Sequence, residues 1–213
     1  DEKIYLGGAR SVAVLDTRID EIVKTVPIST QDVYVQAFAC HGNRVYAATA
    51  VSTISVIDVR NDSFVKEIDI GFHPYAHHLR VGLCAGGNRI YVADSRKGFA
   101  ISVFDENGAL LREIKRPFER VRVPPSFIDG IVKEWKASKY WETIYAHKNP
   151  VVPEYFPALC SFKVDEGRIY AVTAARKDSM SEVVVMDLEG KILGRDFRYP
   201  LTSNYEAAFL NGL

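Results

Sequence analysis

One short segment recurs along the chain, and this repeat restricts the fold more than any other feature of the sequence. Each copy has a basic residue, a β-branched residue, a tyrosine and a small or apolar tail. The copies are KIYLGG (3–8), RVYAAT (44–49), RIYVAD (89–94) and RIYAVT (168–173). Their tyrosines are 41, 45 and 79 residues apart. A recurrence at this spacing indicates a repeat architecture in which each copy forms the same supersecondary unit.

Further predicted strands accompany each copy. A second strand ends on aspartate in every unit: SVAVLD (11–16), TISVID (53–58), AISVFD (100–105) and EVVVMD (182–187). Third strands follow at 21–28, 64–70, 109–115 and 191–197, and strands at 33–40, 78–84 and 158–165 precede three of the tyrosines. Four strands in ~40–45 residues is the content of one propeller blade. The sequence therefore predicts an all-β fold, a β-propeller of four-stranded antiparallel blades with four to five blades recognisable.

The first unit lacks a strand before its tyrosine. A matching segment, NYEAAFLNGL (204–213), stands at the other end of the chain. Pairing of this segment with the N-terminal strands would close the ring and remove two exposed sheet edges. Within the units, strands such as TISVID are apolar on both faces, which is expected when blades pack against blades.

The aspartates that end the second strands have two interpretations. Together, Asp16, Asp58, Asp105 and Asp187 resemble a ring of catalytic carboxylates. However, DENG (105–108) and DLEG (187–190) are typical of turns that begin at Asp and end at a Gly with positive φ. Turn formation accounts for all four, so we interpret them as structural.

The pattern K/R-I/V-Y followed by V-x-V-x-D is similar to YVTN-type and six-bladed NHL-like β-propeller repeats. IDIGFHPYAHHLRV (68–81) resembles the link between YVTN-type blades, and the region from about 117 to 200 resembles bacterial six-bladed propellers. The resemblance covers nearly the whole chain, but its motifs specify blades and no chemistry. Because those families carry six or seven blades, either a small closed propeller or part of a six- or seven-bladed ring is expected.

A long insertion interrupts the repeat at 117–157, within what we predict to be a single propeller domain spanning 1–213. Pro124 and Pro125 end the preceding extended segment, and a helix of roughly 20 residues is expected after Ser126. One face of that helix would carry Ile131, Trp135, Ser138, Trp141 and Tyr145. Trp135 and Trp141 would either brace the propeller or form a lid or partner-docking element.

The loops at the two ends of the blades differ in charge. The end with the insertion would carry basic loops that lengthen along the chain, and the end with the Asp turns would be acidic. The candidate binding residues at the basic end are Arg10, Arg96, Lys97, Arg176 and Lys177, together with Trp135 and Trp141. Such an end favours an anionic ligand or an acidic protein surface.

The histidines and cysteines are the candidate metal ligands and reactive side chains of the sequence. His73, His77 and His78 lie in the linker before an inner strand, where they would hold a transition metal or serve in capping and hydrogen bonds. The three cysteines lack metal-ligand spacing and are predicted to be buried free thiols. They are Cys40, Cys84 and Cys160, and His41 follows the first of them directly.

The composition narrows the function classes. Lys plus Arg and Asp plus Glu number 27 each, so no nucleic-acid partner is expected, and the short apolar runs predict no membrane span. An extracytoplasmic or periplasmic location would follow if a signal peptide had been removed before Asp1.

We predict a non-enzymatic binding or scaffold propeller that binds a protein or anionic ligand on the loop face that carries the insertion. The alternative is a propeller hydrolase, lyase or metal-dependent oxidoreductase, although no G-x-S-x-G, H-E-x-x-H, P-loop or G-x-G-x-x-G motif supports it.

Overall fold

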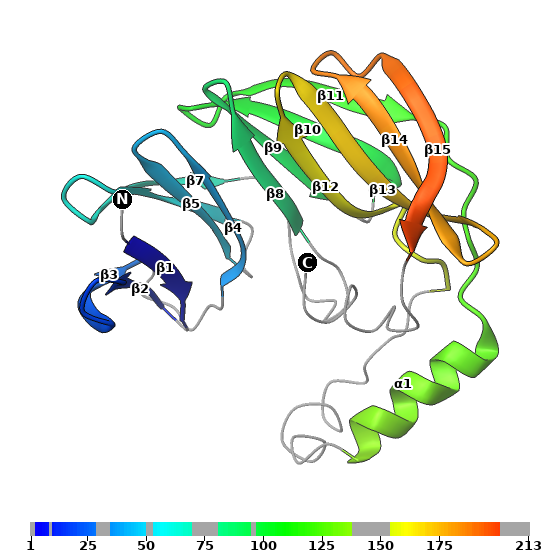
Figure 1. Ribbon diagram of the computed structural model, residues 1–213, viewed down its shortest axis with the longest axis horizontal. Coiled ribbons are helices and arrows are strands. Elements are labelled where there is room, and N and C mark those ends of the chain that lie inside the picture. Colours follow the sequence, from blue (N-terminus) through cyan, green and yellow to red (C-terminus); the bar gives the residue numbers. More distant parts are fainter. Residues whose placement is uncertain are drawn as a thin grey trace.

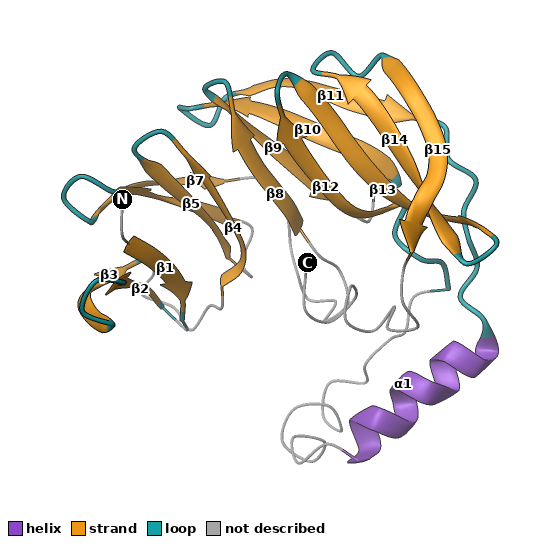
Figure 2. Cartoon of the chain, in the orientation of Figure 1, coloured by secondary structure: helices purple, strands orange, loops and turns teal. Residues whose placement is uncertain are grey.

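Among the residues that the structure describes, the chain forms four antiparallel sheets and one helix (Figures 1 and 2). The computed structural model describes residues 3–8, 10–28, 35–49, 53–69, 81–94, 97–137 and 154–200. No helix in these ranges is long and apolar enough to cross a membrane.

Each sheet is one blade, in which strands pair in chain order. Blade 1 contains β1 (Lys3–Gly7), β2 (Ser11–Asp16) and β3 (Glu21–Pro27). Blade 2 contains β4 (Val35–His41), β5 (Arg44–Thr49), β6 (Thr53–Asp58) and β7 (Ser63–Asp69). Blade 3 contains β8 (Val81–Gly86), β9 (Arg89–Asp94), β10 (Phe99–Asp105) and β11 (Leu110–Arg116). Blade 4 contains β12 (Leu159–Asp165), β13 (Arg168–Lys177), β14 (Met180–Asp187) and β15 (Ile192–Pro200), and α1 (Pro125–Ala137) lies between β11 and β12.

This layout confirms the predicted propeller of four-stranded antiparallel blades with an inserted helix. Blade 1 has three described strands, as the sequence suggested. The segment 204–213, which we expected to supply its fourth strand, lies outside the described residues.

The sequence repeat is also a repeat of strand register. The basic residue that opens each tyrosine strand pairs with the aspartate that ends the next strand: Lys3 with Asp16, Arg44 with Asp58, Arg89 with Asp105 and Arg168 with Asp187. Each tyrosine pairs with a valine: Tyr5 with Val14, Tyr46 with Val56, Tyr91 with Val103 and Tyr170 with Val185. Equivalent residues therefore occupy equivalent places in all four blades.

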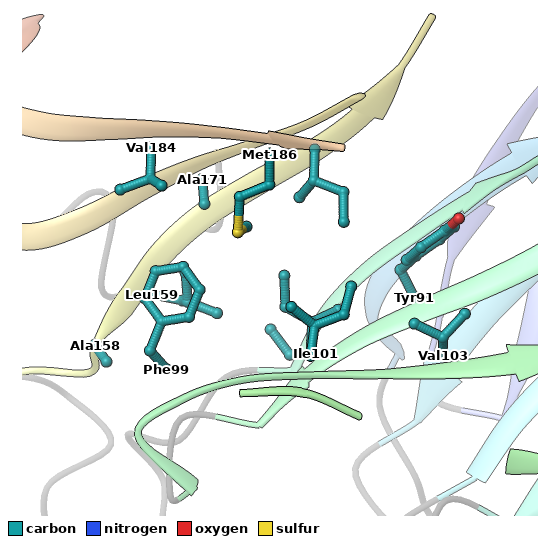
Figure 3. Packing of buried hydrophobic residues seen from close by; sticks show 12 residues of the cluster. Tyr91, Phe99, Ile101, Val103, Ala158, Leu159, Ala171, Val184 and Met186 are labelled. Atoms are coloured by element: carbon teal, nitrogen blue, oxygen red, sulfur yellow. The ribbon is translucent and has the colours of Figure 1, made fainter. Parts of the chain in front are cut away.

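Both faces of the central blades are apolar and buried. In β6, Ile54 and Val56 pack toward blade 3, whereas Ile57 packs toward blade 1. The interface between blades 3 and 4 has the same construction, with Ile101 and Val103 of β10 opposite Met186 of β14 (Figure 3). We call the side of a blade that meets the preceding blade its leading face, and the opposite side its trailing face.

The first strands of blades 2, 3 and 4 lie next to one another. Strand β8 contacts both β4 and β12, although these strands belong to three different sheets. A direct link between two of them comes from Cys84 in β8, whose Sγ accepts a hydrogen bond of 3.1 Å from the backbone N–H of Val164 in β12. These are therefore the inner strands of the propeller.

In blades 3 and 4 the Asp turn also docks the blade onto the preceding one. Gly108 in the β10–β11 turn has φ +88°, and a Cβ placed on it would lie 2.6 Å from Cγ2 of Ile68 in β7. Gly190 in the β14–β15 turn has φ +86° and lies just as tightly against Ile114 in β11. Both positions therefore require glycine for two reasons: the backbone is left-handed, and a neighbouring blade leaves no room for a side chain.

The substitution Gly108→Ala tests this docking. We expect the left-handed conformation to cost about 1–2 kcal/mol of unfolding free energy, and the contact with Ile68 to cost about 1–3 kcal/mol more. Urea unfolding followed by circular dichroism measures the sum of these two losses in the free energy of unfolding. The matched control is Gly87→Ala, because Gly87 has φ +57° and no atom within 4 Å of its Cβ position. Equal losses for the two variants would contradict a tight contact between the blades.

Candidate functional site

The aspartates that end the second strands act as turn residues. Oδ1 of Asp105 accepts hydrogen bonds of 2.8 Å from the backbone N–H groups of Asn107 and Ala109. Asp187 does the same for Glu189 and Lys191, at 3.0 and 2.8 Å. These carboxylates complete local turns, as their sequence context predicted, and do not converge on a common site.

The first two blades add an arginine to this turn. The side chain of Arg18 donates to both carboxylate oxygens of Asp16, and Arg60 does the same for Asp58. In each turn the backbone N–H of the arginine also donates to Oδ1. The arginine side chain and then the backbone bond lower the pKa of each carboxyl to about 2.

Ion pairs join this end of each blade to the next blade. Lys3 of blade 1 reaches Asp62 in the turn of blade 2, with 2.8 Å between Nζ and Oδ2. Arg44 of blade 2 reaches Glu106 of blade 3 at 2.8 Å, and Arg89 of blade 3 reaches Glu189 of blade 4 at 3.8 Å. The prediction of an acidic end is therefore wrong, because bases from the neighbouring blade and from the turns themselves offset the carboxylates.

A pocket of about 690 Å³ opens at this end between blades 1 and 2. Its lining residues are Lys3, Tyr5, Asp16, Arg18, Cys40, Gly42, Arg44, Val45, Val59 and Arg60. Lys3, Arg18, Arg44 and Arg60 each have a carboxylate partner, so the pocket is rich in bases without being strongly basic. Tyr5 donates a 2.9 Å hydrogen bond to Asp62, and burial together with this bond raises the pKa of its phenol.

The opposite end of the blades carries the β13–β14 turn and α1 (Figure 1). The segment leading into the helix is held in place by two backbone hydrogen bonds, both of 2.9 Å. They run from the N–H of Val123 to the carbonyl of Glu154 and from the N–H of Phe156 to the carbonyl of Val121. The two ends of the insertion thus pair with each other.

Aromatic contacts fix the base of the helix. Phe127 in α1 makes an edge-on contact with Phe156, with ring centroids 5.2 Å apart, and the guanidinium of Arg120 lies 3.7 Å from the centre of the Tyr155 ring. Val123 and Ala174 are buried in the same cluster, which joins the insertion to β13. The described helix begins at Pro125, one residue before the expected cap, and residues beyond Ala137 lie outside the described part.

We call this end the helix face and define it by five basic residues: Lys97, Arg122, Lys133, Lys136 and Lys177. Lys97 and Arg122 form ion pairs, with Glu113 at 3.0 Å and with Glu154 at 3.2 Å. Lys133, Lys136 and Lys177 are exposed and form no ion pair within the ranges that the structure describes.

The predicted binding residues are distributed unevenly. Arg10 lies in the β1–β2 connection, and Trp135 lies in α1. The expected long loop around Arg176 and Lys177 is wrong, because both residues continue β13 and pair with Ser181 and Met180 of β14. Two residues, Asp178 and Ser179, close this hairpin with φ values of 50° and 66°. Arg96, Trp141, His73, His77 and His78 lie outside the described residues.

The cysteines differ from the prediction in part. Cys40 is exposed, whereas Cys84 and Cys160 are partly buried, and none of the three is in a disulfide. Burial raises the pKa of the Cys160 thiol to about 12, so this thiol stays protonated at neutral pH. Within the described residues, no group of three His, Cys, Asp or Glu side chains could hold a metal ion.

Sequence reasoning missed two clusters around glutamates. Glu182 in β14 is 1% exposed; its side chain accepts hydrogen bonds from Arg195 and, at 2.9 Å, from Thr173. Glu113 in β11 accepts from both Lys97 and Lys115, and these two lysines lower its pKa to about 2. Charged residues on neighbouring strands were the only available signal. Lys115 lies on the same strand as Glu113, but Lys97, Thr173 and Arg195 lie on other segments, so their contacts with the glutamates follow only from the register of the strands.

Comparisons with known proteins support the fold. No protein-family model matches the sequence, and no curated protein matches it significantly. Raptor from Chaetomium thermophilum matches with a TM-score of 0.58 and 15% identity over 93% of this chain and 15% of that one. Hydrazine synthase from Kuenenia stuttgartiensis matches with a TM-score of 0.56 and 17% identity over 93% and 46%. BamB from Moraxella catarrhalis matches with a TM-score of 0.51 and 12% identity over 92% and 46%.

These three structures are propeller or repeat folds, and the chain spans less than half the length of each. At such low identity the similarity shows the fold alone. The chain is a β-propeller repeat protein.

The lowered carboxyl pKa values predict acid sensitivity. In the folded chain the pKa values of Asp16 and Asp58 are about 2, against an ordinary 3.8, so the unfolded chain takes up protons first as the pH falls. The stabilisation from these pairs is complete above about pH 4 and is lost as the pH falls to about 2. Urea unfolding at a series of pH values should show this decline in the free energy of unfolding.

A double variant, Asp16→Asn with Asp58→Asn, isolates the effect. Asparagine keeps an oxygen that accepts the turn hydrogen bonds but does not titrate, so the decline between pH 4 and pH 2 should be shallower. The control is Asp129→Asn, at an exposed position of α1. The prediction fails if the double variant and the parent lose stability at the same rate over this pH interval.

Proposed function

We propose that the chain is a non-enzymatic β-propeller that binds a protein or an anionic ligand on its helix face. In this proposal residues 1–213 form a single propeller domain, residues 117–157 are an insertion that builds the binding surface, and the repeats are of the YVTN or NHL-like type. The observation that carries the proposal is that five bases at one end of the blades pair with carboxylates, whereas three exposed lysines at the other end form no ion pair within the described residues.

At the end of the blades that carries the Asp turns, which we call the turn end, five basic side chains already have carboxylate partners. Lys3, Arg44 and Arg89 are engaged between blades, and Arg18 and Arg60 are engaged within turns. An incoming anion would have to displace the carboxylate that already pairs with each of these bases. Such pairs contribute to how blades dock and reduce the positive potential that a ligand would meet around these five residues.

At the helix face, three lysines point into solvent beside a firmly attached element. Lys133 and Lys136 lie on α1, whose base is fixed by Phe127 and Phe156, and Lys177 lies at the end of β13. A surface that is ordered before binding loses less conformational entropy when a partner arrives. Among the described residues these lysines have no ion-pair partner, and positive charge of this kind on an ordered surface favours acidic protein segments and anionic ligands and steers their approach.

Charge reversal on the helix face tests the proposal. Poly-glutamate serves as the acidic probe, and its binding to the parent chain is measured by isothermal titration calorimetry at low and at moderate salt. We expect Lys133→Glu with Lys136→Glu to weaken binding by about tenfold or more. The salt dependence of the remaining binding should also be smaller, because fewer charges take part.

The matched control is Lys66→Glu with Lys191→Glu, which changes the net charge by the same amount on other parts of the propeller. Lys66 lies in β7, and Lys191 lies in the β14–β15 turn. This control should retain most of the binding. If the two double variants bind equally, or if the parent does not bind the probe, the helix face is not the binding surface.

A further inference from the structure

One type of blade interface occurs three times in the chain. At each interface, two strands of one blade pack against the same two strands of the next blade: the strand that contains the repeat tyrosine and the strand that follows it. The first blade contributes the residues that point to its trailing face, and the next blade contributes the residues that point to its leading face. Blade 1 uses Tyr5, Val12 and Val14 against Val45, Ala47 and Ile57 of blade 2. Blade 2 uses Tyr46, Ala48, Ile54 and Val56 against Ile90, Val92 and Phe104 of blade 3. Blade 3 uses Tyr91, Ala93, Ile101 and Val103 against Ile169, Ala171, Val184 and Met186 of blade 4.

The leading face of blade 1 is the same surface without a neighbour among the described blades. Ile4 and Leu6 of β1 are 47% and 43% exposed. Their equivalents in blades 2, 3 and 4 are at most 4% exposed: Val45 and Ala47, Ile90 and Val92, Ile169 and Ala171. Covering such side chains removes apolar surface from water, which is favourable, and contiguous exposed apolar patches mark interaction sites.

The trailing face of blade 4 is the complementary surface. Tyr170, Val172, Val183 and Val185 are partly exposed. The equivalent Tyr91, Ala93, Ile101 and Val103 of blade 3 are at most 5% exposed. Blade 4 therefore presents the half-interface that the leading face of blade 1 would cover.

The two partners of the ion pair that joins blades 1 and 2 also have equivalents on these two faces, one on blade 1 and one on blade 4. Asp20 has the position in the blade 1 turn that Asp62 has in the blade 2 turn, four residues after the strand-ending aspartate, and both have positive φ (55° and 49°). Arg168 has the position in blade 4 that Lys3 has in blade 1. Within the described residues Asp20 and Arg168 are exposed and form no ion pair, although Lys3 and Asp62 form one.

We propose that blade 4 of one molecule docks onto blade 1 of a second copy of this chain, head to tail. The two half-interfaces match in apolar pattern and in charge, because each has the construction already used three times within the chain. They cannot meet in one molecule as it is folded here, since blades 1 and 4 lie at opposite ends of the row of sheets (Figure 1). Arg168 and Tyr170 of one copy would then meet Asp20 of the other, as Lys3 and Tyr5 meet Asp62.

A contact of this kind is heterologous, since it joins two different surfaces. It therefore predicts both self-association and a specific pattern of complementation. At micromolar concentration, light scattering coupled to size-exclusion chromatography should give the parent protein the mass of two or more chains, each of 23.9 kDa. A monomeric parent at tens of micromolar would overturn the proposal.

Two single variants block one half-interface each. Leu6→Asp changes the leading face of blade 1, and Val185→Asp changes the trailing face of blade 4. Each variant alone should be monomeric, but an equimolar mixture should form a one-to-one dimer and nothing larger, since one intact interface remains. The control is Leu111→Asp, on the outer strand β11, where Leu111 is equally exposed but lies outside both faces; it should associate like the parent.

The two single variants need a check of folding, because Val185 is partly buried. The near-ultraviolet circular dichroism spectrum of each variant should match that of the parent chain, and each variant should unfold cooperatively in urea. Dimerisation of the mixture is itself evidence that both variants are folded. A mixture that stays monomeric while both variants are folded would overturn the head-to-tail contact.

Charge exchange gives an independent measurement. Arg168→Asp or Asp20→Arg alone should weaken association severalfold by placing like charges together. The double variant Arg168→Asp with Asp20→Arg should recover most of the loss, because the pair is restored between copies in reversed order. Losses that simply add in the double variant would show that these two residues do not meet.

Discussion

Packing of blade on blade is the interaction on which the rest of the structure depends. A single sheet of three or four short strands has two apolar faces and cannot bury either alone. Fully burying a Val or Ile side chain contributes about 1.5–3 kcal/mol, whereas an exposed ion pair contributes about 0.2–1 kcal/mol. The valines and isoleucines of adjacent blades therefore hold the propeller together. The ion pairs and glycine turns set how closely and at which register neighbouring blades dock.

This arrangement decides which charges are available for function. The turn end of each blade lies against its neighbour, so Lys3, Arg44 and Arg89 find carboxylates in the following blade. The helix end has no such requirement, because α1 is attached by the apolar contacts of Phe127 and Phe156. Lys133, Lys136 and Lys177 are exposed at this end and form no ion pair within the described ranges. Among the described blades, the leading face of blade 1 and the trailing face of blade 4 have no neighbouring sheet.

Much of the fold could be predicted because the repeat is strong and local. The alternation within TISVID indicates a strand buried on both faces, and DENG and DLEG indicate Asp turns ending in glycine. The failures concern contacts between distant segments. The acidic end disappears because Arg44 meets Glu106, 62 residues away, and the expected loop at Arg176 is a continued strand because β13 and β14 pair up to a two-residue turn. The exposure of Cys40 likewise depends on what surrounds the end of β4.

The sequence by itself determined the blade: its strand order, its register and the positions of its tyrosines and turn aspartates. These follow from periodicity, side-chain size and turn chemistry, which act within about 45 residues. Tertiary structure alone decided which charges are neutralised, where the helix is anchored and which apolar faces the described blades cover. Those outcomes depend on how one blade is placed against the next, and Lys3 and Asp62 are neighbours only once two separately encoded sheets have packed.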